Sequence, residues 1–259
     1  QHARTGQSGF TLVELLVVMV IGLILLLGVV TLLRQLHHQF RAQTGVARLN
    51  DDARFAFETM REAFQGAGST DPVNLQPVNP ISNMSASQLT VTYFSKAGCY
   101  GENGANLYTV VFSWDKGSWD KGSKELMRNC GQGSQPPPPQ GNQALIGDDD
   151  PAADYATTVD NLQFSYAIDE NADQSIDCWW PPVQGSNGTA AACPPSGQAT
   201  PDSADVIGVR VTLDLSAKNP TPAQPNKNAQ QQQQQDAIRR QYVMTFAIDS
   251  KLGFFVPNQ

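Results

Sequence analysis

The chain has 259 residues, of which 40% are hydrophobic, and a formal net charge of −7. This length suffices for one large domain, or for a long helix followed by a head domain. Charge is uneven, because residues 1–66 hold six arginines and five acids, whereas residues 67–259 hold 11 basic residues and 19 acids. An acidic body does not attract nucleic acid over long range, so no nucleic-acid partner is expected for the head.

Histidine usage limits the chemistry that the head can perform. The three histidines are His2, His37 and His38, and all precede the acidic part of the chain. The head therefore cannot contain a His-dependent catalytic triad or a His-ligated metal. Catalysis by paired carboxylates stays open, but no pattern in the sequence points to it. We therefore expect that the chain is not an enzyme.

Residues 12–33 read LVELLVVMVIGLILLLGVVTLL and contain one charge, Glu14. In a helix they would span roughly 33 Å, which suffices for a bilayer core. The run is too long for a signal peptide, and no small-residue cleavage site follows it. It therefore predicts a retained membrane helix. A carboxylate in such a helix costs about 2.5–3.5 kcal/mol, so Glu14 is either an interfacial residue or a functional one.

The helix is expected to continue beyond the membrane and to span residues 10–66, a length of roughly 80 Å. No proline occurs between residues 10 and 71, and Gly66, Gly68 and Pro72 supply the end. Apolar residues recur at spacings of three and four and predict one buried stripe. These residues are Val46, Leu49, Ala53, Phe57, Met60 and Phe64.

The remaining sequence predicts β structure. Residues 207–216 alternate perfectly between apolar and polar, and residues 162–168 and 242–248 alternate likewise. Weaker strands are expected at 88–95, 107–114 and 124–129. No long helical pattern separates these segments, so the sheet should be mostly antiparallel. The predicted fold class is α+β, with the long helix packed on a β-rich head of residues 67–259.

Three polar segments are expected to form mobile loops that bury no apolar area: residues 132–142, 181–203 and 217–239. The pentad Trp-Asp-Lys-Gly-Ser occurs at 114–118 and again at 119–123. We interpret this duplication as a longer hairpin tip, which exposed turns tolerate. The alternative is a pair of tryptophans that binds a glycan or a partner.

Cys99, Cys130, Cys178 and Cys193 are the four cysteines, and no two of them form a C-x-x-C pair. A thiolate zinc site is therefore not expected. An even number of cysteines behind a membrane segment indicates disulfides in an oxidising compartment. Of the three pairings, we favour the sequential one, Cys99–Cys130 and Cys178–Cys193, because it closes the shortest loops.

Residues 169–177, which follow a predicted strand, carry oxygen ligands with the spacing of a calcium loop. Asp169, Asn171, Asp173 and Asp177 match positions one, three, five and nine. Gln174, however, replaces the usual turn glycine, and the bidentate glutamate is absent. The alternative is a solvated acidic turn without a cofactor, because Asp and Asn favour such bends.

The string Gly9-Phe10-Thr11-Leu12-Val13-Glu14 resembles the cleavage and methylation motif of type IV prepilins. The resemblance implies that residues 1–9 are a leader, which prepilin peptidase removes by cutting between Gly9 and Phe10. Phe10 would then be the N-methylated first residue of the mature chain. Glu14 would pair with the N-terminal amine of a neighbouring pilin during assembly.

The head is similar in plan to the PilW group of minor pilins, in its size, its Arg61-Glu62-Ala63 helix end and its paired late strands. This implies a minor pilin of a type IV pilus, involved in assembly or initiation and so in adhesion or twitching motility. Alternatives are a minor pseudopilin of type II secretion and a membrane-anchored surface adhesin. The resemblance also implies a single-pass inner-membrane protein with a periplasmic head, which later joins the pilus.

The charges that flank the apolar run argue for the opposite orientation. Arg34 and Arg41 follow the run, and counting basic residues alone would place the C-terminal side in the cytoplasm. We favour a periplasmic head because its cysteines indicate an oxidising compartment.

Overall fold

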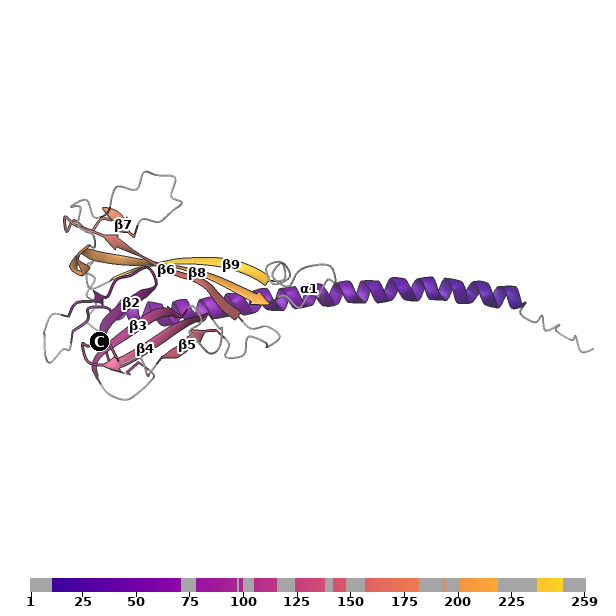
Figure 1. Ribbon diagram of the computed structural model, residues 1–259, viewed down its shortest axis with the longest axis horizontal. Helices are drawn as coiled ribbons and strands as arrows, with labels where there is room; N and C mark the ends of the chain where they lie inside the picture. The colour runs from indigo at the N-terminus through magenta and orange to yellow at the C-terminus, as the bar shows by residue number, and fades with distance from the viewer. Residues whose placement is uncertain are drawn as a thin grey trace, which may run out of the picture.

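One long helix leads into two antiparallel β-sheets and projects far beyond them in the computed structural model (Figure 1). The structure describes residues 11–70, 78–96, 98–99, 105–115, 124–137, 142–147, 157–181, 193, 201–218 and 237–248. The predicted α+β class, with a long N-terminal helix against antiparallel strands, is confirmed.

Helix α1 (Leu12–Gly66) begins and ends with capping interactions. Thr11 is the N-cap, and its hydroxyl accepts a hydrogen bond of 3.4 Å from the backbone N–H of Glu14. The Glu14 carboxylate lies in the first turn, where the helix dipole favours negative charge. At the other end the N–H of Ala67 donates to the carbonyl of Phe64, and Gly68 takes a left-handed φ of 75°. The helix therefore ends at the predicted position.

The first sheet has five strands, in the order β1-β2-β3-β4-β5, and each pairs antiparallel with its neighbour. The three predicted weaker strands correspond to β2, β3 and β4. The strands are β1 (Ile81–Ser82), β2 (Gln88–Ser95), β3 (Asn106–Asp115), β4 (Glu125–Gln132) and β5 (Gln143–Ile146).

The second sheet has four strands, in the order β7-β6-β8-β9, again all antiparallel. The three segments with strict alternation correspond to the three long strands β6, β8 and β9, which pair side by side with β8 in the middle. The strands are β6 (Thr157–Ile168), β7 (Cys178–Trp180), β8 (Val206–Lys218) and β9 (Ala237–Ala247), with a 3₁₀ turn, η2 (Ser203–Asp205), before β8.

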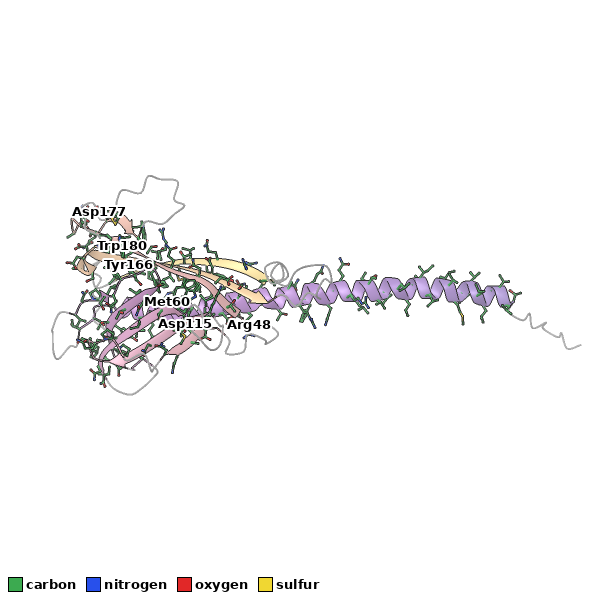
Figure 2. All side chains as sticks on the ribbon, in the orientation of Figure 1. Arg48, Met60, Asp115, Tyr166, Asp177 and Trp180 are labelled. Carbon is green, nitrogen blue, oxygen red and sulfur yellow. A yellow bond between two sulfur atoms is a disulfide. The ribbon has the colours of Figure 1, made fainter. Side chains whose placement is uncertain are left out.

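The head end of α1 packs against both sheets (Figures 1 and 2). The predicted stripe is the buried face, and only Val46 at its start is half-buried. Phe64 joins the two sheets, because its ring centroid lies 6.3 Å from that of Phe112 on β3 and 4.9 Å from that of Phe246 on β9. One helix face therefore closes a single core that both sheets share.

Two aromatic side chains also link the second sheet to the first sheet or to its β1–β2 loop. The Tyr166 hydroxyl, on β6, donates to the Ser85 carbonyl at 2.9 Å and accepts from the Ser85 N–H at 3.2 Å. Burial raises the pKa of this phenol well above its ordinary value, so it stays protonated. The Trp114 indole donates to the Val159 carbonyl at 3.1 Å. Trp114 therefore has a structural role, while residues 116–123 of the duplicated segment lie outside the described part.

The proline-rich segment after β4 corrects one expectation from the sequence. Gly131 has no Cβ, and an added one would lie 2.6 Å from the Cβ of Pro137. The Thr109 hydroxyl donates to the Gly133 carbonyl at 2.7 Å, which holds the start of the segment against β3. The prediction that residues 132–142 bury no apolar area is therefore wrong for Pro137, which is half-buried because Gly131 at the end of β4 leaves room for its ring.

Candidate functional site

Among the described residues, no segment packs against the first half of α1. It is the one helix in the described residues that is long and apolar enough to cross a membrane, and none of its most apolar window is buried. Leucine, valine and isoleucine side chains project from all sides of it (Figure 2). Such a surface requires lipid or other apolar helices around it.

Glu14 is the one charged side chain in this apolar half. The next charged residue along the helix is Arg34, twenty positions later and roughly 30 Å away at 1.5 Å per residue. The head lies farther still along the same helix (Figure 1). Within the described residues the Glu14 carboxylate therefore has no basic group in reach, and a counter-charge has to come from elsewhere.

The predicted site residues do not converge on one centre. Glu14 lies at the free end of α1, whereas the cysteines and the acidic loop lie in the head (Figures 1 and 2). Gly9 and Phe10, the predicted cleavage and methylation residues, lie outside the described part. The predicted site residues within the described part therefore lie in two separate regions, the start of α1 and the head.

The N-terminal segment also matches a known family. Residues 4–30 fit the family described as the prokaryotic N-terminal methylation motif, and this range includes Gly9, Phe10 and Glu14. The N-terminal segment is type IV pilin-like. Together with the long helix and the antiparallel head, this pilin-like motif supports a pilin-type subunit.

No curated protein matches the chain. Among solved structures, the chain is similar to a type IV-like pilin from Thermus thermophilus, with 11% sequence identity and a TM-score of 0.45. The similarity covers 77% of this chain and 96% of the other. The pilin-like assignment rests on the N-terminal motif.

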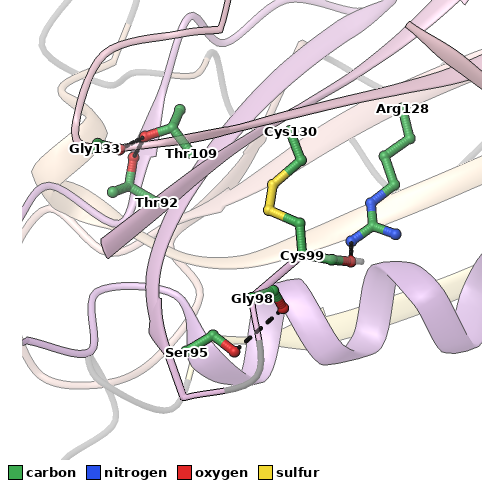
Figure 3. The surroundings of a disulfide bond; sticks show 8 residues. All are labelled: Thr92, Ser95, Gly98, Cys99, Thr109, Arg128, Cys130 and Gly133. Carbon is green, nitrogen blue, oxygen red and sulfur yellow. Dashed lines mark hydrogen bonds between the residues drawn. A yellow bond between two sulfur atoms is a disulfide. The ribbon is translucent and has the colours of Figure 1, made fainter. Parts of the chain in front are cut away.

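Two disulfides join the cysteines in sequential pairs, the first with the second and the third with the fourth. Cys99 joins Cys130 with a Cα–Cα distance of 6.2 Å, and Cys178 joins Cys193 with a Cα–Cα distance of 5.6 Å. The first ties the segment after β2 to β4, and the Arg128 guanidinium donates to the Cys99 carbonyl at 2.7 Å (Figure 3). These are the sequential pairs favoured from the sequence.

The acidic loop between β6 and β7 forms hydrogen bonds mainly with its own backbone. Asp169, only 5% exposed, accepts from the N–H groups of Asp173 at 3.3 Å and Gln174 at 2.8 Å. Asp177 accepts from the Glu170 N–H at 2.8 Å. Gln174, which replaces the glycine of a calcium loop, has a left-handed φ of 67°. The backbone therefore makes the turn without glycine.

The described side chains of this loop are not arranged as a metal-binding site. Among the described residues, no three Asp, Glu, His or Cys side chains are grouped so that they could hold an ion. The carboxylates of Asp169, Asp173 and Asp177 instead satisfy backbone N–H groups. Calcium binding by these residues and Asn171 stays a prediction.

Sequence reasoning missed two contacts beside this loop. The Arg210 guanidinium, on β8, lies 3.9 Å from the centroid of the Trp179 ring, a cation–π contact. Tyr166 stacks near Trp180, with ring centroids 5.9 Å apart. The alternation of β8 places Arg210 on the face opposite Val209 and Val211, but no local signal identifies Trp179 as its partner.

Proposed function

We propose that this chain is a minor pilin of a type IV pilus, which helps to initiate or assemble the filament and so supports adhesion or twitching motility. Residues 1–9 are its leader, residues 10–66 its assembly helix and residues 67–259 its head. The helix crosses the inner membrane once, over about residues 12–33, and the head is periplasmic until the subunit enters the pilus.

Glu14 is the observation that carries this proposal. A lone carboxylate in an apolar helix is costly, and the described chain offers it no counter-charge. Cleavage after Gly9 would create a positive amine at Phe10, close to the level of Glu14 in an adjacent parallel helix. Pairing these charges between subunits offsets the cost of burying each of them. The bare apolar surface of α1 would meet neighbouring helices in the same step.

The decisive variant is Glu14→Gln, which removes the charge and keeps the shape of the side chain. Insertion into the membrane should be unchanged or better. Incorporation into sheared filaments should fall by at least about tenfold, because a buried amine loses its partner. Leu25→Val, in the same helix, is the matched control and should assemble normally. Assembly of Glu14→Gln at the wild-type level would contradict the proposal.

A pseudopilin of type II secretion would use the same helix and the same motif. A strain that lacks the gene separates the two, because a minor pilin is needed for surface pili and a pseudopilin for secretion of exoproteins. An anchored adhesin would leave both intact and lose only surface binding. Loss of filaments with normal secretion is the expected result.

A further inference from the structure

Two exposed apolar side chains of the head lie on α1 and on the strand beside it. Within the described residues beyond Phe40, three large apolar side chains are exposed: Phe55 at 58%, Val243 at 55% and Ile176 at 49%. Phe55 is on α1 and Val243 is on β9, whereas Ile176 lies in the acidic loop. Single exposed apolar residues are ordinary, so a role for Phe55 depends on a surface that matches it.

β9 runs alongside the head end of α1 (Figure 1), and a cleft of about 260 Å³ lies between them. The Tyr242 hydroxyl donates to the Asn50 Oδ1 at 2.6 Å and bridges its two sides. Arg54 and Glu58 also line the cleft, and Arg61 of the same chain lies 3.2 Å from Glu58 and offsets its charge. The apolar walls come from both elements and suit an aromatic ring: Ala53, Phe57, Tyr242, Val243 and Met244.

We propose that Phe55 of one subunit docks in this cleft of a second copy of the chain. Phe55 and Phe57 are two positions apart, which at 3.6 residues per turn places them on opposite sides of α1. The contact is therefore heterologous, because each subunit offers Phe55 to one neighbour and its cleft to another. Contacts of this kind extend into open helical assemblies when the rotation does not close. The inference rests on the proposed function, in which one membrane keeps the helices parallel.

The stagger of the two helices follows from the proposed pairing of Glu14 with the amine of Phe10. This pairing sets Phe10 of the second subunit level with Glu14 of the first, a shift of four residues or about 6 Å. The helix residues that line the cleft run from Asn50 to Glu58. Phe55 of the first subunit is then one residue past Asn50 of the second, within the length of the cleft. In the opposite sense Phe55 would lie one residue past Glu58, beyond its end.

Arg240 supplies a positive charge on the side of β9 that faces the helix. Side chains alternate along a strand, so Ile238, Arg240 and Tyr242 project to the same face. Ile238 lies beside Gly45 of α1, because a Cβ added to that glycine would be 3.1 Å from the Ile238 Cδ1. Tyr242 contacts Asn50, so Arg240 lies about midway between the levels of Gly45 and Asn50.

Acidic residues flank Phe55 on α1 and meet basic groups in this register. Asp51 precedes Phe55 by one turn, and the shift of four residues brings it to the level of Arg240 in the second subunit. The side chains of Asp51 and Arg240 are both exposed. Glu58, one turn after Phe55, comes level with Arg54 beside the cleft. Opposite charges at matched positions select this register and orientation over others.

Energy transfer between subunits in lipid vesicles tests the contact with the full chain, labelled with donor or acceptor dye at Lys124→Cys, an exposed position before β4. Asp51→Arg and Arg240→Asp should each weaken self-association at least about tenfold, because like charges then face each other. A mixture of the two variants should recover the association, since every mixed pair again matches opposite charges. Arg239→Asp, whose side chain projects to the other face of β9, is the matched control and should associate like the parent chain.

Phe55 is tested in the same assay. Phe55→Ser should weaken self-association, and Phe55→Leu, which keeps an apolar side chain, should retain most of it. Unchanged association in either charge variant, no recovery in their mixture, or equal association of the two Phe55 variants would overturn the proposal.

The vesicle assay needs no filament, so its failure is distinguishable from failure of the proposed function. Recovery in the mixture, together with normal filament assembly of Glu14→Gln, would contradict the proposed function and uphold this contact. Loss of filaments in Glu14→Gln without recovery in the mixture would overturn this contact alone.

Discussion

Hydrogen bonds stabilise the ionised carboxylate of Asp173 in the acidic turn between β6 and β7. The Ser175 hydroxyl and N–H donate to its carboxylate, and these hydrogen bonds lower the pKa of Asp173 below the ordinary value of about 3.9. A lowered pKa in the folded state means that the ionised form stabilises the fold above pH 3.9, and that this contribution disappears as the pH falls through the lowered pKa.

Ser175→Ala should therefore raise the pKa of Asp173 toward its ordinary value, because the hydroxyl donor is lost. An NMR titration of the side-chain carboxyl carbons measures this directly. An unchanged Asp173 titration would mean that the Ser175 hydroxyl does not contribute.

Calcium binding at Asp169, Asn171, Asp173 and Asp177 is a separate prediction for the same loop. The spacing of the four oxygen ligands supports it, and millimolar calcium should raise the melting temperature of the full chain. Magnesium should not, because it requires a tighter octahedral shell. Asp173→Ala should abolish the shift. Identical melting with calcium and with chelator would leave a turn stabilised by its own hydrogen bonds alone.

At the level of elements, the α1 stripe is the main link between the helix and both sheets. Phe64 is fully buried between Phe112 and Phe246. Phe64→Ala should lower the free energy of unfolding by about 3–5 kcal/mol, the usual cost of truncating a buried phenylalanine. Phe55→Ala, on the exposed side of the same helix at 58% exposure, should change it by less than about 0.5 kcal/mol. Urea denaturation of the full chain measures both.

The elements differ in how well sequence predicts them, and the reason is length. α1 and the strands β6, β8 and β9 have enough residues for a period of 3.6 or 2 to stand out. β1, β5 and β7 have two to four residues, too few for any period, and depend on pairing with a longer neighbour. The division into two sheets was not predicted either, because it depends on long-range contacts such as the Tyr166–Ser85 hydrogen bonds.

The site residues differ in how well sequence predicts them according to their separation along the chain. The motif around Glu14 and the cysteine pairs involve residues near one another in the sequence, so they can be proposed without a structure. The contact of Arg210 with Trp179 and the cleft beside β9 join segments far apart in the chain. Local patterns contain no information about such contacts until the sheet register is known.

For the whole molecule, the orientation in the membrane is the property on which two sequence signals disagree. Arg34 and Arg41 follow the apolar run and by the positive-inside rule favour a cytoplasmic head. All four cysteines are paired in the structure, and disulfides persist in oxidising compartments such as the periplasm. We give the disulfides more weight, because a cytosolic head would be kept reduced.

Phe55→Cys decides between the two orientations. Phe55 lies on the exposed side of α1 at the head, and the four native cysteines are bridged, so the new thiol would be the one free thiol. With a periplasmic head, a charged maleimide that passes the outer but not the inner membrane should label it in intact cells. The control combines Gln7→Cys with Gly9→Arg, which should block cleavage and keep the leader thiol in the cytoplasm, where labelling requires lysis. Labelling of Phe55→Cys only after lysis would place the head in the cytoplasm and contradict export to a pilus.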